Sequence, residues 1–448
     1  MTAGSRRLRR WAAALLVPAA ALAWLGTTGA GHQVAATAPA MTGQALEGRL
    51  GEAALRRTLA ELDARLERLP GDPEARLLRA MVLFKLGRLP EARAELDELV
   101  AAAPGFGLAH VVRGDLLLAG VEAVSDVGAG IRVLGLGDPG DAERRLEALR
   151  AEARARLQAY LARNATERVP LQLLQLDPAT GPALLVDKLH NRLYVFVPTG
   201  PDTPPRLVRD VYVSIGKLIG DKQKRGDLRT PEGVYRVTTW IPDEKLPDKY
   251  GLGAFPVNYP NLLDRRRGKT GYGIWLHGTE KRYYSRPPRD SEGCVVLANS
   301  DLAALRRWVT PGRTPVIIAS SLDWVPVEQW RAARAEVLAA LEAWRRDWES
   351  LDVERYLSHY DADFWSGTGD LAAWAARKRR IARQKTFQKV ALSELSLFAY
   401  PRPVDGRRVV VAWFRQDYTS NNYRSRTRKR LYLARGGDGP WRILYEGR

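Results

Sequence analysis

The sequence predicts a multidomain chain that combines an α-helical repeat region, a mostly-β domain and a C-terminal α+β unit. Its 448 residues are enough for two to four domains, each with its own core. The apolar period is helical before Pro170, changes to short runs rich in Val, Leu and Tyr after it, and returns to helical at Val327. We therefore divide the chain at these changes, into residues 1–40, 41–168, 169–324 and 325–448.

Residues 1–40 have the features of a secretory signal peptide or an N-terminal anchor. Four arginines among the first ten residues precede an apolar run, Trp11–Leu25, and small residues that include Ala36-Thr37-Ala38. The run is shorter than the ~20 residues that a membrane-spanning helix needs. We therefore expect the rest of the chain to be exported, to the periplasm or the cell envelope, and we expect no nucleic acid partner.

The region 41–168 is predicted to be helical and to contain a repeat. Between Pro73 and Phe106, small, large and helix-ending residues stand close to the positions that a tetratricopeptide unit of about 34 residues requires. This segment resembles one tetratricopeptide repeat flanked by half-repeats, and stacked helix pairs of this kind present a groove to a protein partner. A plain bundle of Ala-, Leu- and Arg-rich helices is the alternative. A further uninterrupted helical stretch runs from Asp141 to Asn164.

The region 169–324 is predicted to be mostly β. Its apolar runs are short, contain many Val, Leu and Tyr residues, and are separated by turn formers such as His190-Asn191. The predicted strands are Ala183–Asp187, Arg192–Val197, Val208–Ser214, Gly233–Thr239, Gly273–His277 and Pro315–Ala319.

The region 325–448 is predicted to begin with helices and to end with antiparallel strands, an order that indicates an α+β unit. The segment AWRRDWESLDVERYLSHYDADF at 343–364 resembles the nuclear-transport-factor-two-like (SnoaL-like) family, which implies a cone made of a curved sheet wrapped by helices. The predicted helices are Val327–Ser350, Leu351–Tyr360 and Leu371–Gln384, and the predicted strands are Gln388–Tyr400, Arg407–Ser420, Tyr423–Ala434 and Trp441–Tyr445.

The net charge of +19 is concentrated near the C-terminus. From Leu371 onward there are 19 Lys or Arg residues against 5 Asp or Glu residues. The basic stretches Arg377–Lys389 and Arg424–Arg430 could hold an anionic wall polymer or a membrane surface. The alternative, which the alternating pattern slightly favours, is that they are solvent-facing residues of a helix and a strand.

The residue that points most directly to chemistry is Cys294, the single cysteine of the chain. One thiol cannot form an intramolecular disulfide, so in an exported protein it pairs with another chain, reacts, or is buried and inert. A cysteine nucleophile needs a base, and His277 lies 17 positions upstream at the end of a strand-like run. Gly293 permits a tight backbone approach, with N–H groups that could face an oxyanion.

This stretch resembles the active-site signature of the L,D-transpeptidase (YkuD-like) family. The signature is a histidine followed by Gly or Ser, a loop of about sixteen residues, and Ser/Thr-x-Gly-Cys. The matching residues are His277, Gly278, Ser291, Gly293 and Cys294. Three further segments carry the resemblance, and the last two are similar to the YafK-like branch: KRGDLRTPEGVYRV at 224–237, YGLGAFPVNYPNLLD at 250–264 and NSDL at 299–302.

The resemblance implies cysteine-dependent acyl transfer on peptidoglycan stem peptides. Cys294 would attack the carbonyl between the diaminopimelate centre and D-Ala, and His277 would take the thiol proton. The backbone carbonyl of Gly278 would orient the imidazole, and the amides around Gly293 and Cys294, behind Ser291, would bind the oxyanion. No cofactor is implied, and the sequence contains no His-Glu-x-x-His or paired-cysteine spacing that predicts a metal.

Two departures from the family pattern leave the acceptor open. Many members carry histidine where this chain has Glu292, and arginine where it has Val296. Both departures recur in the YafK-like branch, where the resemblance implies hydrolysis as readily as transfer. The alternatives are therefore an amidase or carboxypeptidase that hydrolyses the same linkages or releases wall-bound lipoprotein, and, in another class, a non-catalytic wall-binding scaffold.

Overall fold

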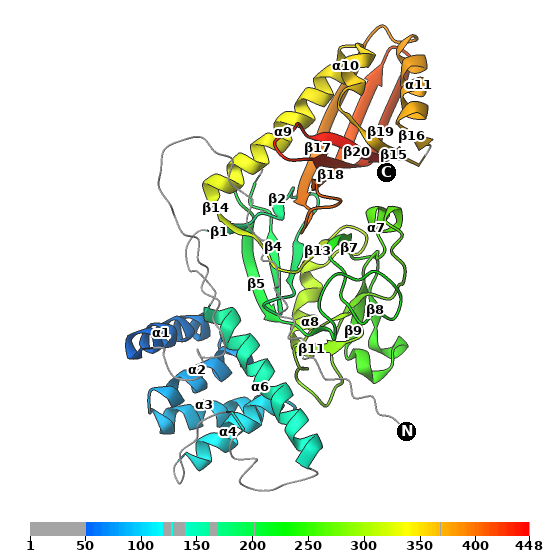
Figure 1. The fold of residues 1–448 in the computed structure, drawn as a ribbon. Coiled ribbons are helices and arrows are strands. Elements are labelled where there is room, and N and C mark those ends of the chain that lie inside the picture. The colour runs from blue at the N-terminus through cyan, green and yellow to red at the C-terminus, as the bar shows by residue number, and fades with distance from the viewer. Residues whose placement is uncertain are drawn as a thin grey trace, which may run out of the picture.

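The computed structural model describes residues 51–119, 127–128, 139–161, 168–200, 202–367 and 369–447, so the predicted leader at 1–40 lies outside the described residues. Three units follow one another along an elongated molecule, the helical unit at one end and the C-terminal unit at the other (Figure 1). None of the described helices has both the length and the apolar content needed to cross a bilayer.

The helical unit is a stack of antiparallel helices that enclose one apolar core. Asp72 starts the second helix, because its carboxylate accepts hydrogen bonds from the N–H groups of Glu74 and Ala75, and Pro73 occupies the first turn. Leu62, Leu78 and residues like them are fully buried between the helices. The described helices are α1 (Glu52–Arg68), α2 (Pro73–Lys85), α3 (Leu89–Ala102), α4 (Gly107–Leu118) and α6 (Pro139–Leu161).

The central unit contains a five-stranded sheet in the order β5-β4-β3-β13-β7, in which only β3 and β13 are parallel neighbours. The two faces of β3 are both buried, so its first four residues are apolar without alternation, and only the last, Asp187, is polar. The strands are β3 (Ala183–Asp187), β4 (Arg192–Val197), β5 (Arg206–Tyr212), β7 (Gly233–Arg236) and β13 (Pro315–Ala319). Predicted and observed bounds are the same for β3, β4 and β13.

A smaller four-stranded sheet, in the order β12-β10-β9-β8, packs on one face of the five-stranded sheet. Its core joins Leu276 and Val295 to Val186 and Ile318 of the larger sheet. The remaining elements of the central unit are β6 (Ile215–Gly216), β8 (Ile241–Pro242), β9 (Gly253–Pro256), α7 (Leu262–Arg266), β10 (Trp275–His277), β11 (Arg289–Ser291), β12 (Val295–Val296) and α8 (Asn299–Leu305).

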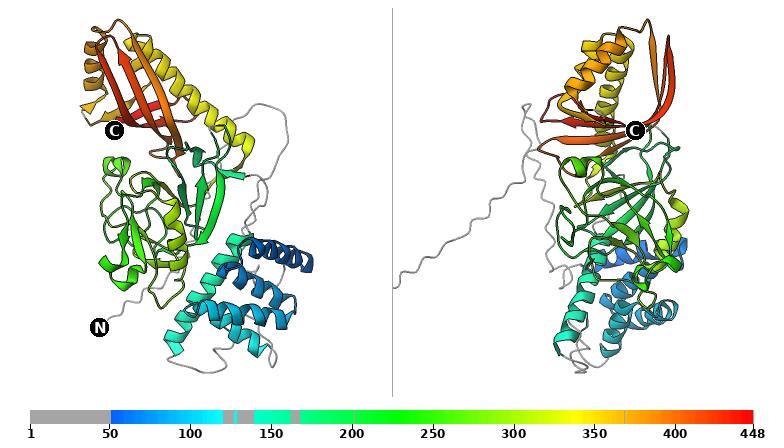
Figure 2. Two further views of the ribbon diagram at one scale, coloured as in Figure 1. Left: turned by 180° about the vertical axis from the view of Figure 1, so that it is seen from behind. Right: turned by 90° about the vertical axis from the view of Figure 1, so that its right-hand side faces the viewer.

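The C-terminal unit is a curved seven-stranded sheet, in the order β16-β15-β20-β19-β18-β17-β2, with three helices against it (Figure 2). Trp344, Phe414 and Leu431 belong to the core between the helices and the sheet. The elements are α9 (Val327–Glu349), α10 (Val353–Leu357), β15 (Tyr360–Ser366), β16 (Gly369–Asp370), α11 (Leu371–Ala382), β17 (Gln388–Ala399), β18 (Arg408–Ser420), β19 (Tyr423–Arg435) and β20 (Arg442–Gly447).

The C-terminal unit differs from the prediction in its second helix and in its sheet, which contains β15, β16 and β2 besides the four predicted strands. The helix predicted at 351–360 is shorter, because Leu351 has a left-handed φ of 68° and Tyr360 already belongs to β15, where it pairs with Ile443 of β20. The sheet also takes in β2 (Leu173–Gln175), which lies inside the predicted catalytic region but pairs with β17. Three residues are too few for the sequence to indicate which sheet edge they join.

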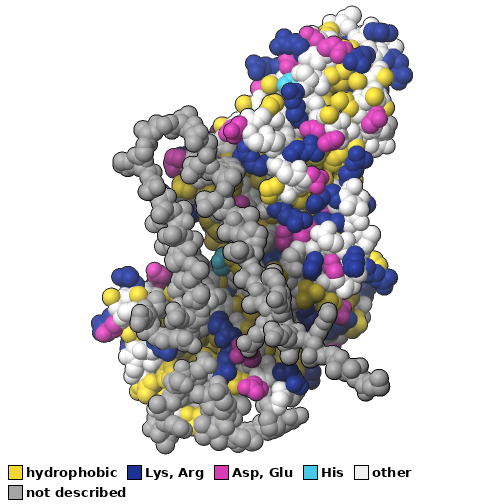
Figure 3. All heavy atoms as spheres, viewed as in Figure 1, with side chains coloured by type: hydrophobic (Ala, Val, Ile, Leu, Met, Phe, Trp, Pro, Cys, Tyr) yellow, Lys and Arg dark blue, Asp and Glu magenta, His cyan; other side chains and the backbone are white. Residues whose placement is uncertain are grey.

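The central and C-terminal units are joined through shared packing. β1 (Arg168–Pro170) pairs with β14 (Trp324–Pro326), so the chain enters and leaves the central unit side by side. The second face of the five-stranded sheet shares one core with the C-terminal sheet, in which Leu185 and Ile317 cluster with Phe398. On the face that Figure 3 shows, Lys and Arg side chains are spread over the visible surface and interspersed with acidic ones.

Candidate active site

Of the two residues that the sequence singled out for chemistry, His277 ends β10 and Cys294 immediately precedes the neighbouring strand β12. β10 and β12 are parallel, with Leu276 opposite Val295 and His277 opposite Val296, and the N–H of Leu297 donates to the carbonyl of His277 at 2.8 Å. In this register Cys294, immediately before β12, lies level with Trp275. Side chains two residues apart on a strand point to the same face, so Cys294 and His277 lie on the same face of the sheet, offset by one strand and two residues.

His277 is held as a neutral base. Its Nδ1 lies 2.6 Å from the carbonyl oxygen of Gly278. A carbonyl only accepts, so Nδ1 carries the proton and Nε2 keeps a free lone pair. The side chain is 4% exposed, and burial lowers the pKa of His277 from 6.5 to about 4, with the backbone contact and the charges around it having smaller effects. The ring of Tyr250 packs edge-on against the imidazole at 4.9 Å between centroids.

The turn that supplies the Gly278 carbonyl is fixed by Asn299. Asn299 Nδ2 donates to the carbonyl of Thr279 at 2.8 Å, and its Oδ1 accepts from the N–H of Leu252 at 3.1 Å. A Cβ on Gly278 would lie 2.0 Å from Asn299 Oδ1, so a side chain there would displace this amide. Asn299 is therefore a positioning residue, and its role was not predicted although it begins the NSDL segment.

Removing the Asn299 amide is expected to reduce turnover without removing the base. In Asn299→Ala the 278–279 turn loses its support, and we expect kcat to fall about tenfold with little change in KM, together with a loss of about 1–3 kcal/mol of stability because the Leu252 and Thr279 groups lose their partner. Steady-state kinetics and thermal unfolding check both effects. The matched control is Ser300→Ala at the exposed neighbouring position, which should change neither.

Ser291 and Gly293 shape the turn that presents the cysteine. Ser291 Oγ donates to the carbonyl of Cys294 at 2.6 Å and accepts from the N–H of Gly293 at 3.1 Å. Gly293 has a φ of 129°, and a Cβ there would lie 2.7 Å from the Arg229 carbonyl oxygen. Because the N–H of Gly293 already has an acceptor, the N–H of Cys294 is the better candidate of the two for an oxyanion.

Cys294 is partly exposed, and its Sγ lies 3.4 Å from the carbonyl oxygen of Gly273, to which the thiol donates. Desolvation raises the pKa of Cys294 from 9.0 to about 11, and the N–H of Trp275 and the charge of Arg286 offset this only in part. At neutral pH the resting pair is therefore a thiol beside a neutral imidazole, not a thiolate–imidazolium ion pair.

The state of the thiol can be measured directly, since the chain has one cysteine. With a pKa of about 11, alkylation of the folded protein by iodoacetamide is expected to accelerate through pH 10 without a plateau near pH 9. Intact-mass spectrometry at each pH measures the rate. The unfolded chain in denaturant serves as the control and should level off about two pH units earlier. A folded protein that reacts at its maximal rate at pH 7 would contradict the neutral resting pair.

Two cationic side chains that the sequence did not single out, Arg286 and Lys249, lie near His277 and Cys294. Arg286 donates through Nε to Thr279 Oγ1 at 3.2 Å and through an NH2 group to the Lys249 carbonyl at 2.8 Å, and it pairs with Glu280 at 3.0 Å. The charges of Arg286 and Lys249 lower the pKa of both His277 and Cys294. Arg286 lies in a loop with several basic residues, so the sequence offered no reason to choose it.

The threonine-proline-glutamate-glycine segment at 230–233 has a structural role. Lys188 Nζ pairs with Glu232 at 2.8 Å and donates to the Thr230 carbonyl at 2.9 Å, all in the buried interior. Thr230 Oγ1 in turn accepts from the N–H of Gly216 at 2.9 Å. These contacts fix the backbone at 229–230, against which the Gly293 turn packs.

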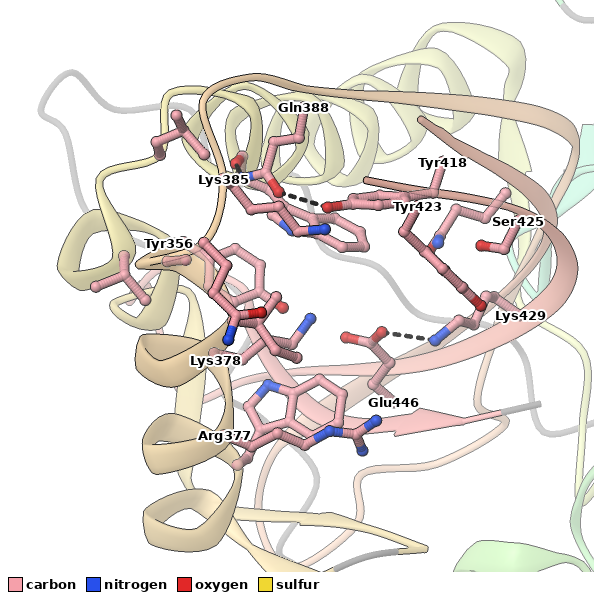
Figure 4. A pocket seen from close by; sticks show the side chains of 18 of the residues that line it. Tyr356, Arg377, Lys378, Lys385, Gln388, Tyr418, Tyr423, Ser425, Lys429 and Glu446 are labelled. Carbon is pink, nitrogen blue, oxygen red and sulfur yellow. Dashed lines mark hydrogen bonds and ion pairs between the residues drawn. The ribbon is translucent and has the colours of Figure 1, made fainter. Parts of the chain in front are cut away.

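A second candidate site is a cavity of about 810 Å³ in the C-terminal unit (Figure 4). Lys378 is surrounded by aromatic rings, with Nζ 4.4 Å from the centroid of Trp348, 5.0 Å from Tyr356 and 4.6 Å from Trp374. Burial lowers the pKa of Lys378 to about 8. On the sheet side of the cavity, Lys429 of β19 pairs with the buried Glu446 of the neighbouring strand β20 at 2.9 Å.

Part of the basic C-terminal sequence lines this cavity. Arg377, Lys378 and Lys385 from one basic stretch and Lys429 from the other line it. Lys378, Lys385 and Lys429 are partly buried there and are not merely solvent-facing, as the alternating pattern favoured, whereas Arg377 is exposed. Ammonium groups, aromatic faces and amides in one cavity can receive an anionic group attached to an apolar or sugar-like body.

Comparison with known proteins agrees with the three-part fold. Family models match the L,D-transpeptidase catalytic domain at residues 181–318, the Cds6 C-terminal NTF2-like domain at 336–447 and a tetratricopeptide repeat at 45–112. The structure of Bd1075 from Bdellovibrio bacteriovorus is 30% identical with a TM-score of 0.56, and the match covers 63% of this chain and 98% of that chain. The chain belongs to the YkuD-type L,D-transpeptidase catalytic domain family.

Two further proteins are similar to parts of the chain. A structure of the helical cell shape determining protein Pgp2 from Campylobacter jejuni is 27% identical with a TM-score of 0.52, covering 64% of this chain and 96% of that chain. YafK of Escherichia coli K12, whose name assigns it provisionally to the L,D-transpeptidases, is 29% identical over 92 residues, which are 20% of this chain and 32% of YafK. The predicted family resemblances and the three-part fold class are confirmed.

Proposed function

We propose that this protein is a cysteine-dependent L,D-transpeptidase that remodels peptidoglycan through a thioester on Cys294. The observation that carries the proposal is the neutral, buried imidazole of His277, fixed by the Gly278 carbonyl on the strand beside Cys294. Acyl transfer of this kind requires a nucleophile, a base and a group that orients the base. Here these would be Cys294, His277 and the backbone carbonyl of Gly278.

The chemistry follows from the resting protonation states. Nε2 of His277 accepts the thiol proton as Sγ of Cys294 attacks the carbonyl carbon between diaminopimelate and D-Ala. The C–N bond then breaks, and the departing D-Ala amine takes that proton from the imidazolium. An acceptor amine next attacks the thioester, loses its proton to His277, and forms the new amide as the thiol is restored. Because the thiol pKa is about 11, thiolate forms only together with the attack.

Hydrolysis of the same thioester by water is the second candidate. The specific observation in its favour is Val296, which is 3% exposed and paired with His277 and Ser214 in the position where many family members carry arginine. With water as acceptor, the protein would act as a carboxypeptidase or amidase, or release wall-bound lipoprotein. A non-catalytic wall-binding scaffold, with the helical unit and the C-terminal unit recruiting partners, is the alternative of another class.

The direct experiment is incubation of the purified full chain with disaccharide-tetrapeptide, followed by mass spectrometry. Cross-linked dimers with release of D-Ala support transfer, and shortened stems alone support hydrolysis. If neither product forms, with or without an added amine acceptor or a lipoprotein-linked muropeptide, the enzymatic proposals fail and the scaffold remains.

The wider setting extends the same proposal. We expect export to the periplasm or cell envelope from the leader-like start, and a role in cell shape by likeness to Pgp2, whose name states that role. The tetratricopeptide-like helices would bind a protein partner. The cationic cavity of the C-terminal unit would receive an anionic wall polymer, with a membrane surface as the alternative.

A further inference from the structure

The loop that connects the two reactive residues is in contact with the helical unit. This loop, residues 278–294, leaves β10 after His277 and returns to Cys294, and Figure 1 shows the helical unit lying against the β11 end of the central unit. The N–H of Tyr284 donates to the carbonyl of Gly105 at 3.0 Å, and the Tyr284 ring packs on Phe106 with 4.3 Å between centroids. Ser285 Oγ donates to Glu152 Oε1 of α6 at 2.7 Å.

Gly105 makes this close approach possible. A Cβ at Gly105 would lie 2.4 Å from the carbonyl oxygen of Arg282 and 3.2 Å from the Cα of Tyr283, both backbone atoms of the loop. The φ of Gly105 is outside the left-handed region, so its own backbone does not require glycine. The need for a residue without a side chain therefore comes from the loop.

A chain of buried ion pairs ties the same place to the central sheet. Arg156 of α6 pairs with Glu152 and with Glu74, each at 2.8 Å, and Arg192 of β4 pairs with Glu74 at 2.7 Å. Each of these four side chains is at most 8% exposed, so the pairs are shielded from solvent. These buried ion pairs therefore fix the helical unit to the central sheet at a place next to the loop.

The central sheet holds the loop from its other side. Tyr212 of β5 donates through its hydroxyl to the carbonyl of Arg286 at 3.0 Å, and Asn191 Nδ2 donates to the carbonyl of Pro288 at 2.8 Å. Arg286 is the next residue after Ser285, and its side chain points to Thr279 and Lys249 beside His277. The docked loop therefore determines where this charge lies relative to the reactive pair.

We propose that the helical repeat unit is a positioning element of the active site, and that Gly105, Phe106 and Glu152, through Tyr284 and Ser285, hold Arg286 beside His277 and Cys294. The effect on catalysis rests on the proposed function, whereas the docking itself does not. In this arrangement the helices contribute to the reaction without any of their side chains reaching the reacting atoms, and Arg286 acts through the charge that it places there.

The consequences for His277 have a definite sign. The charged groups that face its ring are Arg286, Lys249 and Glu280, of which the first two lower its pKa and the third raises it, and the phenol of Tyr250 packs against it. Loosening the loop moves Arg286 away and admits water, and both changes raise the pKa of His277. The acid limb of the activity profile should therefore move to higher pH.

The test is Gly105→Ala in the full chain, with Gly107→Ala as the matched control. A Cβ at Gly107, two residues along at the start of α4, would meet only Leu149 at an ordinary 3.8 Å. For Gly105→Ala we expect faster hydrogen–deuterium exchange in residues 279–290, a fall of about tenfold in kcat/KM on disaccharide-tetrapeptide, and an acid limb shifted upward by about half a pH unit. For Gly107→Ala we expect wild-type values in all three.

A second variant covers the case in which Gly105→Ala disturbs the helical unit itself. Ser285→Ala removes the hydrogen bond to Glu152 and leaves every helix unchanged, so faster loop exchange and a smaller loss of kcat/KM in the same direction would support the proposal. Arg286→Lys should restore part of the activity lost in Arg286→Ala. Wild-type loop exchange and a wild-type acid limb in both Gly105→Ala and Ser285→Ala would overturn the proposal.

The two proposals fail in different ways. If the wild-type protein leaves disaccharide-tetrapeptide unchanged, the proposed function fails, and the docking is then decided by loop exchange and by alkylation of Cys294 with iodoacetamide. Faster exchange together with a changed alkylation rate in Gly105→Ala supports the docking. Exchange and alkylation equal to those of wild type overturn it.

Discussion

Replacement of Cys294 by alanine is expected to abolish acyl transfer and hydrolysis, with a loss of about 10⁴-fold or more in kcat. The protein has no second thiol, and His277 has no other nucleophile on the neighbouring strand to activate. The side chain is small and partly exposed, so the variant should keep the wild-type melting temperature within a few degrees. Product formation from disaccharide-tetrapeptide, measured by mass spectrometry, gives the result.

Two controls make the Cys294→Ala result specific. A carbapenem resembles the acyl donor, so the wild-type protein should gain the mass of one carbapenem and Cys294→Ala should gain none. Ser300→Ala, in the exposed first turn of α8, should acylate as the wild type does. Full complementation of a deletion strain by Cys294→Ala would refute catalysis by this residue and favour the scaffold.

Much of the fold could be predicted because its signals are local. β3, β4 and β13 are short apolar runs between turn formers, and α9 carries a helical stripe that includes Trp330 and Trp344, so pattern alone gave their places. β2 could not be placed in this way, since its partner β17 lies more than 200 residues away. The pairing of such distant segments is decided by packing, which a periodic pattern does not contain.

The same distinction holds for the site. His277 and Cys294 stand in one continuous motif, and the prediction that Gly278 would orient the imidazole needs only adjacent residues. Arg286 acts through a loop whose position depends on Gly105, 181 positions upstream of Arg286, and on the helix that carries Glu152. Nothing in the sequence near Gly105 distinguishes it from an ordinary turn glycine, because the atoms that exclude a Cβ belong to another unit.

Replacement of His277 by glutamine is expected to lower kcat by about 10²–10⁴-fold, because the amide keeps a similar size but cannot take the thiol proton at neutral pH. In the wild type, with a His277 pKa of about 4, kcat/KM should hold between pH 7 and about pH 5 and then fall as Nε2 becomes protonated. An acid limb of kcat/KM centred near pH 6.5, the ordinary pKa of histidine, would show that the ring is solvated. It would contradict a mechanism in which His277 acts as a buried neutral base.

The pH dependence of the free energy of unfolding should show the titration of His277 independently of activity. The folded state holds His277 neutral while the unfolded chain binds a proton below about pH 6.5, so the unfolded state binds more protons as the pH falls and the stability decreases. A shift from 6.5 to about 4 corresponds to a loss of roughly 3 kcal/mol between pH 7 and pH 4. His277→Gln lacks this titration, so the stability difference between the variant and the wild type, measured by denaturant unfolding, should move in favour of the variant by that amount on acidification. A stability difference between variant and wild type that stays constant from pH 7 to pH 4 would mean that the imidazole is not buried in its neutral form. Proton transfer from Cys294 to His277 would then need a different geometry from the one that the Gly278 carbonyl fixes.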